Sequence, residues 1–363
     1  MNRFFDVIIC GLAVFACVDT ACARDGARDW ASPGSFVSSV GNADESSVLP
    51  EVPGQGDDHG KNDDQKGGFR VGMREPGGPR GGMGPSTKPD PELQKILDEV
   101  QDKFELLTFD DPDSGFKMQY LLFVPENYDA SQQYPLVMFI PDARAAGRDP
   151  NFSLSVGWGG VVWATAAEQT KRPCFVLIPV FTEVIVDDDF NTSPQIAVAV
   201  RLIENLCQTR SIDTNRLYAT GQSMGGMTSF HLSVAYPDLF AAYLFVGSQW
   251  NNDVLDVLET KRFFYIVSAG DDKASAGQNG LISVFERDKI PYAREEWSAQ
   301  EDRDVQNALV KSMIEQGFDA NFVSFTKGTT VADGQAVKSE HLTSFDYAYK
   351  LESVREWLFL QHK

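Results

Sequence analysis

One serine stands at the centre of the segment best suited to chemistry. The sequence Gly-Gln-Ser-Met-Gly occupies residues 221–225, with Ser223 in the middle, after an apolar, strand-like run and before a helix-compatible segment over 227–236. A serine at a tight turn from strand to helix has strained backbone, and glycines two positions before and after it leave room for the adjoining chain. The helix start also presents free N–H groups to a nearby negative charge. The pattern predicts that Ser223 is a nucleophile.

A serine hydroxyl needs a base within hydrogen-bond reach, and the sequence offers four histidines. His59 lies in a stretch with few aliphatic residues, and His362 is next to the last residue. His231 follows Ser223 by about two helical turns, which carries it away from the nucleophile. His341 remains, in a polar loop between the last expected strand and the final helix. Enzymes with this kind of serine turn have the chain order nucleophile, acid, histidine, with the histidine after the last strand, and His341 fits that order.

The acid that orients the base is expected after a strand between the serine and the histidine. The apolar run 263–269 leads directly into Gly270, Asp271 and Asp272. A carboxylate there can accept the imidazole N–H, fix its tautomer and stabilise the imidazolium. We predict Asp271, nearest the strand end, as the acid, with Asp272 as the alternative.

An oxyanion that forms during attack on a carbonyl needs two backbone donors. The amide of Met224, directly after the serine, is the first candidate, and the amide of Ala143, in the loop after a central strand, is the second. Asp142 in the same loop would oppose the developing negative charge unless it is paired, and Arg144 and Arg148 are the partners at hand.

Two tryptophans and two cysteines have more than one interpretation. Trp158 and Trp163 follow the oxyanion loop and are candidates to line an acyl or aryl pocket, although core packing suits either as well. Cys174 and Cys207 either form a disulfide or remain as two buried thiols. The sequence has no metal-ligand spacing and no phosphate-binding glycine loop, so we expect no metal and no cofactor.

The N-terminal region has the pattern of an export signal. Within residues 1–23, Arg3 precedes an apolar core over 4–18, and small residues stand at the positions before a cleavage site. The core is shorter than the roughly 20 residues of a membrane span. We therefore expect a secreted or periplasmic protein without stable membrane insertion. Lipid anchoring at Cys17 is less favoured because the bulky Phe15 precedes it.

Composition separates a linker from a folded domain. Residues 24–91 are rich in Gly, Pro, Asp and Ser, which predicts a disordered linker. Residues 92–363 form the expected catalytic domain. The net charge of −20 over 363 residues disfavours nucleic acid and anionic membranes as partners.

Within the domain, apolar runs alternate with helical patterns, which predicts an α/β fold with a mostly parallel sheet covered on both faces. Ligands of such sheets bind at the carboxyl ends of the strands, where Ser223 is expected. Besides the strand that leads into Ser223, the expected strands are 104–109, 117–125, 136–140, 175–179, 243–246, 263–269 and 321–325. The expected helices are 91–103, 163–169, 194–209 and 347–361, besides the one after Ser223.

Several short motifs resemble one known family. They are Leu-Phe-Val-Pro-Glu-Asn-Tyr at 122–128, Tyr-Pro-Leu-Val at 134–137, Ile-Asp-Thr-Asn-Arg-Leu at 212–217, Gly-Gln-Ser-Met-Gly-Gly at 221–226 and Tyr-Pro-Asp-Leu-Phe at 236–240. This set resembles the secreted esterases related to polyhydroxybutyrate depolymerases, some of which are described as predicted peptidases. The resemblance covers about 104–360.

The resemblance implies the α/β-hydrolase fold, no cofactor and a catalytic triad of Ser223, Asp271 and His341. Two departures from the family pattern stand near these residues. Pro-Asp at 141–142 replaces the His-Gly of the oxyanion loop, and Ser-Ala-Gly-Asp at 268–271 replaces the His-Gly-x-x-Asp around the acid.

The sequence as a whole predicts a serine hydrolase that cleaves a small-molecule or polymer-derived ester through an acyl-enzyme. A serine peptidase of the same fold is the first alternative. The second is a binding protein that keeps the fold without the chemistry, since a fold alone does not define a function.

Overall fold

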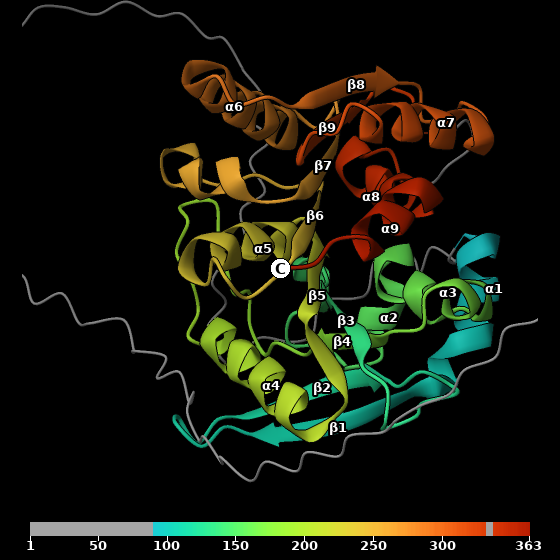
Figure 1. Ribbon diagram of the computed structural model, residues 1–363, viewed down its shortest axis with the longest axis vertical. Helices are drawn as coiled ribbons and strands as arrows, with labels where there is room; N and C mark the ends of the chain where they lie inside the picture. The colour runs from blue at the N-terminus through green and yellow to red at the C-terminus, as the bar shows by residue number, and fades with distance from the viewer. Residues whose placement is uncertain (1–89, 332–336) are drawn as a thin grey trace, which may run out of the picture. The chain divides into compact units, whose positions relative to one another are not determined.

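The computed structural model describes residues 90–331 and 337–363. The predicted signal peptide over 1–23, the predicted linker up to residue 89, and His59 lie outside the described residues. The described part is one compact unit with a central sheet (Figure 1).

Nine strands form this sheet in the order β1-β2-β4-β3-β5-β6-β7-β9-β8. Only β2 runs antiparallel to its neighbours, β1 and β4, and all other neighbouring pairs are parallel. The strands are β1 (Phe104–Asp110), β2 (Lys117–Phe123), β3 (Tyr134–Ile140), β4 (Phe175–Pro179), β5 (Ile212–Gln222), β6 (Ala242–Val246), β7 (Phe263–Ser268), β8 (Ala293–Trp297) and β9 (Ala320–Phe325).

The strands of the sheet centre are apolar because helices cover both of their faces. Every residue of β3 and of β6 is buried. Edge strand β8 differs, since only its end residues, Ala293 and Trp297, are buried and the three residues between them are charged and exposed. This strand was not predicted, because its single apolar pair does not produce a recognisable strand pattern.

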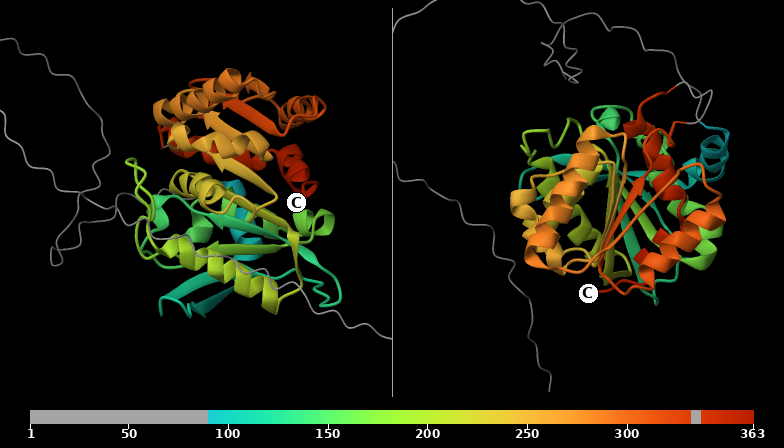
Figure 2. Two further views of the ribbon diagram at one scale, coloured as in Figure 1. Left: turned by 60° about the vertical axis from the view of Figure 1, so that its left-hand side comes forward. Right: turned by 90° about the horizontal axis from the view of Figure 1, so that it is seen from above.

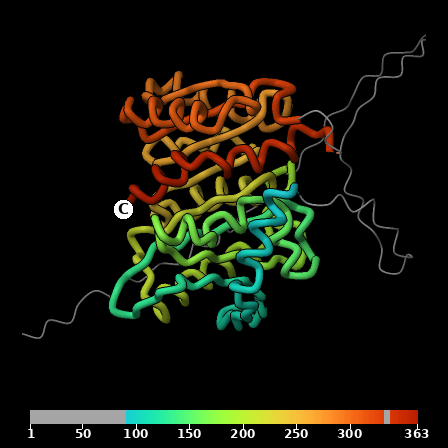
Figure 3. The backbone as a smooth tube through the Cα atoms, turned by 90° about the vertical axis from the view of Figure 1, so that its right-hand side faces the viewer, coloured from blue at the N-terminus to red at the C-terminus, as the bar shows by residue number. Residues whose placement is uncertain are grey.

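Helices pack on both faces of the sheet in two layers (Figures 1 and 2). One layer contains α4 (Gln195–Thr209), α5 (Met224–Ala235) and α6 (Asp272–Asp288), whose apolar residues share one core cluster. The other contains α1 (Pro91–Val100), α2 (Phe152–Ser155), α3 (Ala166–Lys171), α7 (Arg303–Ile314), α8 (Glu340–Lys350) and α9 (Glu352–Phe359), and every one of these helices except α3 contributes apolar residues to a second cluster. Figure 3 faces this second layer, with α1 in blue and α8 and α9 in red. The predicted α/β architecture is confirmed.

Short 3-10 turns join these elements: η1 (Gln101–Lys103), η2 (Ala143–Ala145), η3 (Trp158–Gly160), η4 (Val162–Ala164) and η5 (Asn252–Thr260). The helix expected over 163–169 is divided between η4 and α3. Helix α1 begins after Asp90, whose carboxylate accepts a hydrogen bond from the backbone N–H of Glu92, as its sequence predicts. None of the described helices is long and apolar enough to cross a bilayer.

The C-terminal region corrects one prediction. The single final helix expected over 347–361 is in fact two helices, α8 and α9, separated at Leu351. Because α8 starts at Glu340, His341 lies in a helical first turn and not in a loop. Residues 338–343 are mostly polar, so no apolar periodicity marks the start of this helix in the sequence. Contacts with distant segments hold the helix start in place instead.

Trp163 belongs to the core and not to a substrate pocket. Its side chain is fully buried, its indole N–H donates to the Gly159 carbonyl at 2.8 Å, and its ring packs edge-on against Tyr349. The expectation that Trp163 lines an acyl or aryl pocket is therefore wrong, because its entire surface is covered by the second core cluster.

We expect Trp163→Ala to lower the free energy of unfolding by about 3–5 kcal/mol, since it removes a large buried ring and leaves a cavity. Urea denaturation measures the change. Leu360→Ala is the matched control because that side chain is 68% exposed, and it should shift stability by no more than about 0.5 kcal/mol. A loss for Trp163→Ala as small as that of the control would contradict this description of the core.

The two cysteines are free thiols in the structure. Cys174 lies in the core cluster on one face of the sheet, whereas Cys207 packs against the cluster on the other face, so a disulfide between them is excluded. Burial raises the pKa of Cys174 to about 12 and that of Cys207 to about 11. Both thiols therefore stay protonated near neutral pH and are poor nucleophiles.

Candidate active site

Ser223 occupies the turn between β5 and α5, with backbone angles φ 52° and ψ −119°. A non-glycine residue in this region has a strain of about 1–3 kcal/mol and persists only where the surroundings impose it. The flanking glycines allow the turn to form: a β-carbon on Gly221 would overlap the backbone of Gly225, and one on Gly225 would overlap the Ile140 carbonyl. The predicted strand–turn–helix context of Ser223 is present.

His341 reaches this serine from the first turn of α8. Its Nε2 lies 2.8 Å from Ser223 Oγ, and its Nδ1 lies 2.5 Å from Asp271 Oδ2. The ring also packs edge-on against Phe345, with the ring centroids 5.0 Å apart. An ionised Asp271 assigns the proton to Nδ1, which leaves Nε2 free to accept the serine proton. The structure thus brings together three residues that are far apart in the sequence.

The two adjacent aspartates have different positions. Asp271 is buried, and while Oδ2 faces His341, Oδ1 caps α6 by accepting the backbone N–H of Ala274 at 3.3 Å. Asp272 is exposed in the first turn of α6 and forms no hydrogen bond with His341 in the described part of the chain. The geometry therefore favours Asp271 over Asp272 as the partner of the histidine.

The two amides expected to bind an oxyanion lie on elements that meet at the serine turn. Met224 starts α5, and Ala143 starts η2 in the loop after β3. The close approach of Gly225 to the Ile140 and Pro141 carbonyls packs this loop directly against the turn. Within the described residues, neither amide donates a hydrogen bond, so both are available to a ligand.

The buried carboxylate of Asp142 anchors that loop through an ion pair with the more exposed Arg144. Its carboxylate accepts two hydrogen bonds from the Arg144 guanidinium, both at 2.8 Å, and a third at 2.8 Å from Gln222, the residue before the serine. Burial raises the pKa of the Asp142 carboxyl, but the hydrogen bonds and charge of Arg144 and the hydrogen bond from Gln222 outweigh it, and the net pKa is lowered. The condition that Asp142 must be paired is met by Arg144, while Arg148 lies over the ring of Phe152.

We expect Asp142→Ala to lower the free energy of unfolding by about 1–3 kcal/mol, because it removes the carboxylate that accepts hydrogen bonds from the Arg144 guanidinium and the Gln222 amide and leaves both only the Val156 carbonyl as a shared acceptor. The measurement is urea denaturation at neutral pH. Asp102→Ala, which removes an exposed carboxylate, serves as control. Equal stability of the two variants would show that the Asp142 network does not hold the loop.

Trp158 lies beside α8. Its backbone N–H donates to Asp346 at 2.8 Å, and the Lys350 ammonium lies 4.8 Å from the centre of its indole ring. The side chain is partly exposed. Its place in a substrate pocket stays a prediction.

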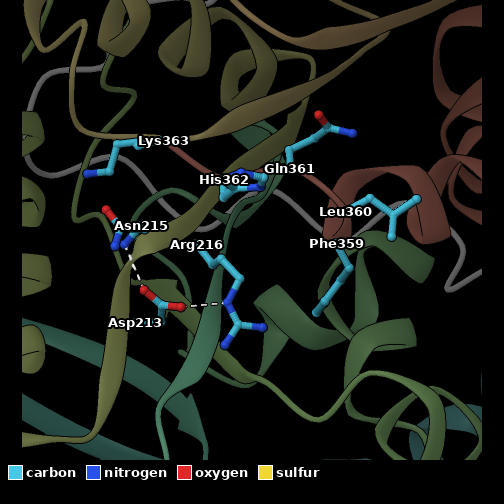
Figure 4. A pocket seen from close by; sticks show the side chains of 8 residues that line it. All are labelled: Asp213, Asn215, Arg216, Phe359, Leu360, Gln361, His362 and Lys363. Carbon is cyan, nitrogen blue, oxygen red and sulfur yellow. Dashed lines mark hydrogen bonds and ion pairs between the residues drawn. The ribbon is translucent and has the colours of Figure 1, made fainter. Parts of the chain in front are cut away.

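The other described histidines lie away from Ser223. His231 lies on α5 and packs against Trp250, and burial lowers the pKa of His231. His362 lines a hollow of about 460 Å³ together with Arg216 and Lys363 (Figure 4). That hollow lies at the amino-terminal end of β5, opposite the end that carries Ser223.

One acidic group could hold a metal ion among the residues that the structure describes. It consists of Asp256, Glu259 and Asp288, which are largely exposed on η5 and α6. Arg287 already pairs with Asp256 at 3.4 Å and with Asp288. None of these residues bonds to Ser223, His341 or Asp271.

No family model and no curated protein matches the sequence. Solved structures do resemble the fold. A thermostable esterase is 24% identical with a TM-score of 0.58, and the match covers 73% of this chain and 64% of that one. The feruloyl esterase module from Clostridium thermocellum is 13% identical with a TM-score of 0.48, covering 74% and 92%. A putative dipeptidyl aminopeptidase IV from Bacteroides ovatus is 13% identical with a TM-score of 0.44, covering 71% and 36%.

Only the first of these likenesses is close enough to support a statement about the fold. This chain spans about 64% of the length of that esterase. Its own strand order supports the same conclusion, since the turn that carries Ser223 follows β5 at the centre of a mostly parallel sheet. The described part of the chain has the α/β-hydrolase fold.

Proposed function

We propose that this protein is a serine hydrolase that cleaves carboxylic esters, either small molecules or fragments of a polymer, through an acyl-enzyme. The observation that carries the proposal is the continuous hydrogen-bonded series from Ser223 through His341 to Asp271. Strained non-glycine residues cluster at functional sites, and the hydroxyl of this strained serine lies within hydrogen-bond distance of a histidine.

The first half of the reaction forms the acyl-enzyme. Ser223 Oγ attacks the ester carbonyl carbon while His341 Nε2 takes the hydroxyl proton. The carbonyl oxygen becomes negative and accepts hydrogen bonds from the Met224 and Ala143 amides. The carbon–oxygen bond to the alcohol then breaks, and His341 returns its proton to the leaving alcohol. Asp271 stabilises the imidazolium in both steps.

The second half releases the acid. A water molecule gives a proton to His341 Nε2 and attacks the acyl carbon, and the same amides hold the oxyanion. Collapse of this intermediate breaks the bond to Ser223, which regains its proton from His341. The balanced reaction consumes one ester and one water and produces one carboxylic acid and one alcohol, with no cofactor.

Two further statements belong to this proposal. The export pattern of residues 1–23 and the composition of 24–91 support a secreted or periplasmic protein whose catalytic domain follows a linker. The net charge of −20 disfavours nucleic acids and anionic membranes as partners.

The esterase that shares this fold supports ester over peptide cleavage. The test compares short p-nitrophenyl esters with peptide p-nitroanilides as substrates of the wild-type protein. Turnover of the esters with a higher kcat/KM is the expected result. Preference for the anilides would show a serine peptidase instead of an esterase. Turnover of neither substrate would favour the non-catalytic binding protein.

A further inference from the structure

Glu340, the residue before His341, joins three separate elements at one carboxylate oxygen. Its Oε2 accepts a hydrogen bond from the Ser268 hydroxyl at 2.7 Å and another from the Gly328 backbone N–H at 2.9 Å. Ser268 is the last residue of β7, Gly328 lies in the loop after β9, and Glu340 begins α8. One side chain therefore ties the start of α8 to the ends of two neighbouring strands.

The Glu340 carboxylate also packs directly against the turn over 268–271, which carries Asp271. A β-carbon on Gly270 would overlap both oxygens of Glu340, so only glycine leaves the space that the carboxylate fills. The Gly270 N–H approaches the Ser268 hydroxyl oxygen at 3.4 Å, and the Asp271 N–H donates to the Ser268 carbonyl at 3.0 Å. Ser268 thus links the Glu340 carboxylate to the backbone of the turn that ends at Asp271.

Among the residues that the structure describes, the first turn of α8 has one other long-range side-chain hydrogen bond, from the Thr343 hydroxyl to the Thr330 hydroxyl at 3.2 Å, besides those of His341 itself. Ser339, at the position that usually caps a helix, makes no side-chain capping bond. An uncapped first turn tends to fray because its N–H groups have no partners. His341 lies in this first turn, so its position depends on what holds the turn in place.

We propose that Glu340 is a positioning residue that holds the first turn of α8 against the turn over 268–271 and so keeps His341 in register with Asp271 and Ser223. The inference rests on the proposed function for its effect on turnover. A displacement of about 1 Å in a reacting group can lower a rate by about 100-fold. We therefore expect loss of the Glu340 contacts to affect kcat more than the free energy of unfolding.

Three variants test the proposal by steady-state kinetics with a p-nitrophenyl ester. Glu340→Ala removes the carboxylate, and Gly270→Ala displaces it from the opposite side. Both should lower kcat by about 10- to 100-fold with little change in KM. Glu340→Gln should keep most of the wild-type kcat, because one amide oxygen can accept both hydrogen bonds. Glu315→Ala, which removes an exposed carboxylate directly after α7, is the control.

Proton NMR of the same proteins detects the hydrogen bond between His341 and Asp271 independently of turnover. The Nδ1 proton shared by His341 and Asp271 should give a far-downfield resonance, assigned by its loss in His341→Ala. It should persist in Glu340→Gln and vanish in Glu340→Ala and Gly270→Ala, while thermal unfolding shows that all variants fold.

A resonance and a kcat that are unchanged in Glu340→Ala would overturn the inference, as would a wild-type spectrum without the resonance. If the wild-type protein turns over no ester but the resonance responds as stated, the proposed function fails and the positioning role of Glu340 stands.

Discussion

Replacing Ser223 with alanine is expected to lower kcat for ester hydrolysis by about 10⁵- to 10⁶-fold. The variant keeps the histidine and the oxyanion donors but has no nucleophile, so no acyl-enzyme can form. Because Ser223 Oγ bonds only to His341 among the described residues, the fold should be unchanged. Stopped or continuous assays with a p-nitrophenyl ester measure the loss.

Ser283→Ala provides the matched control for this experiment. It removes a serine hydroxyl from an exposed position on α6 and should leave kcat and KM at their wild-type values. Ester turnover by Ser223→Ala at a rate near that of Ser283→Ala would show that the hydrolysis does not pass through Ser223.

Asp271→Asn should lower kcat by about 10⁴-fold. An asparagine amide facing His341 Nδ1 favours the tautomer with the proton on Nε2, which cannot then accept the proton of Ser223. Stability should change little, because asparagine caps a helix about as well as aspartate and can replace Asp271 at the start of α6. The measurement is kcat at saturating ester, together with a urea denaturation curve.

Asp272→Asn separates this account from the alternative acid. Its side chain is exposed and makes no bond to His341, so the variant should hydrolyse esters at the wild-type rate. The reverse ranking, with the large loss at Asp272, would require His341 and α6 to be arranged differently in solution.

The sequence predicted the central strands because burial on both faces demands apolar runs, as in β3 and β6. It also led to Ser223, since the glycines at 221 and 225 are required by the backbone contacts that the turn makes. His341 followed from elimination, because only four histidines were present. The central strands and Ser223 were predictable because each has a local sequence pattern. His341 was predictable because the sequence offers few histidines.

Features that depend on contacts between distant segments were missed. The charged strand β8 is stabilised by pairing with β9, and the start of α8 by Glu340, which bonds to residues 72 and 12 positions earlier in the chain. Trp163 was ambiguous for the same reason, since only the packing of α8 and α9 shows that its ring is covered. Nothing in the local sequence of these residues encodes their partners.

Covalent labelling with a fluorophosphonate probe, followed by peptide mass spectrometry, tests the central claim most directly. The probe reacts with a serine that is activated by a neighbouring base, whatever the natural substrate is. The account predicts one adduct, on Ser223 in the peptide that joins β5 to α5, and none in Ser223→Ala. An adduct on another residue, or a wild-type protein that remains unlabelled, would contradict it.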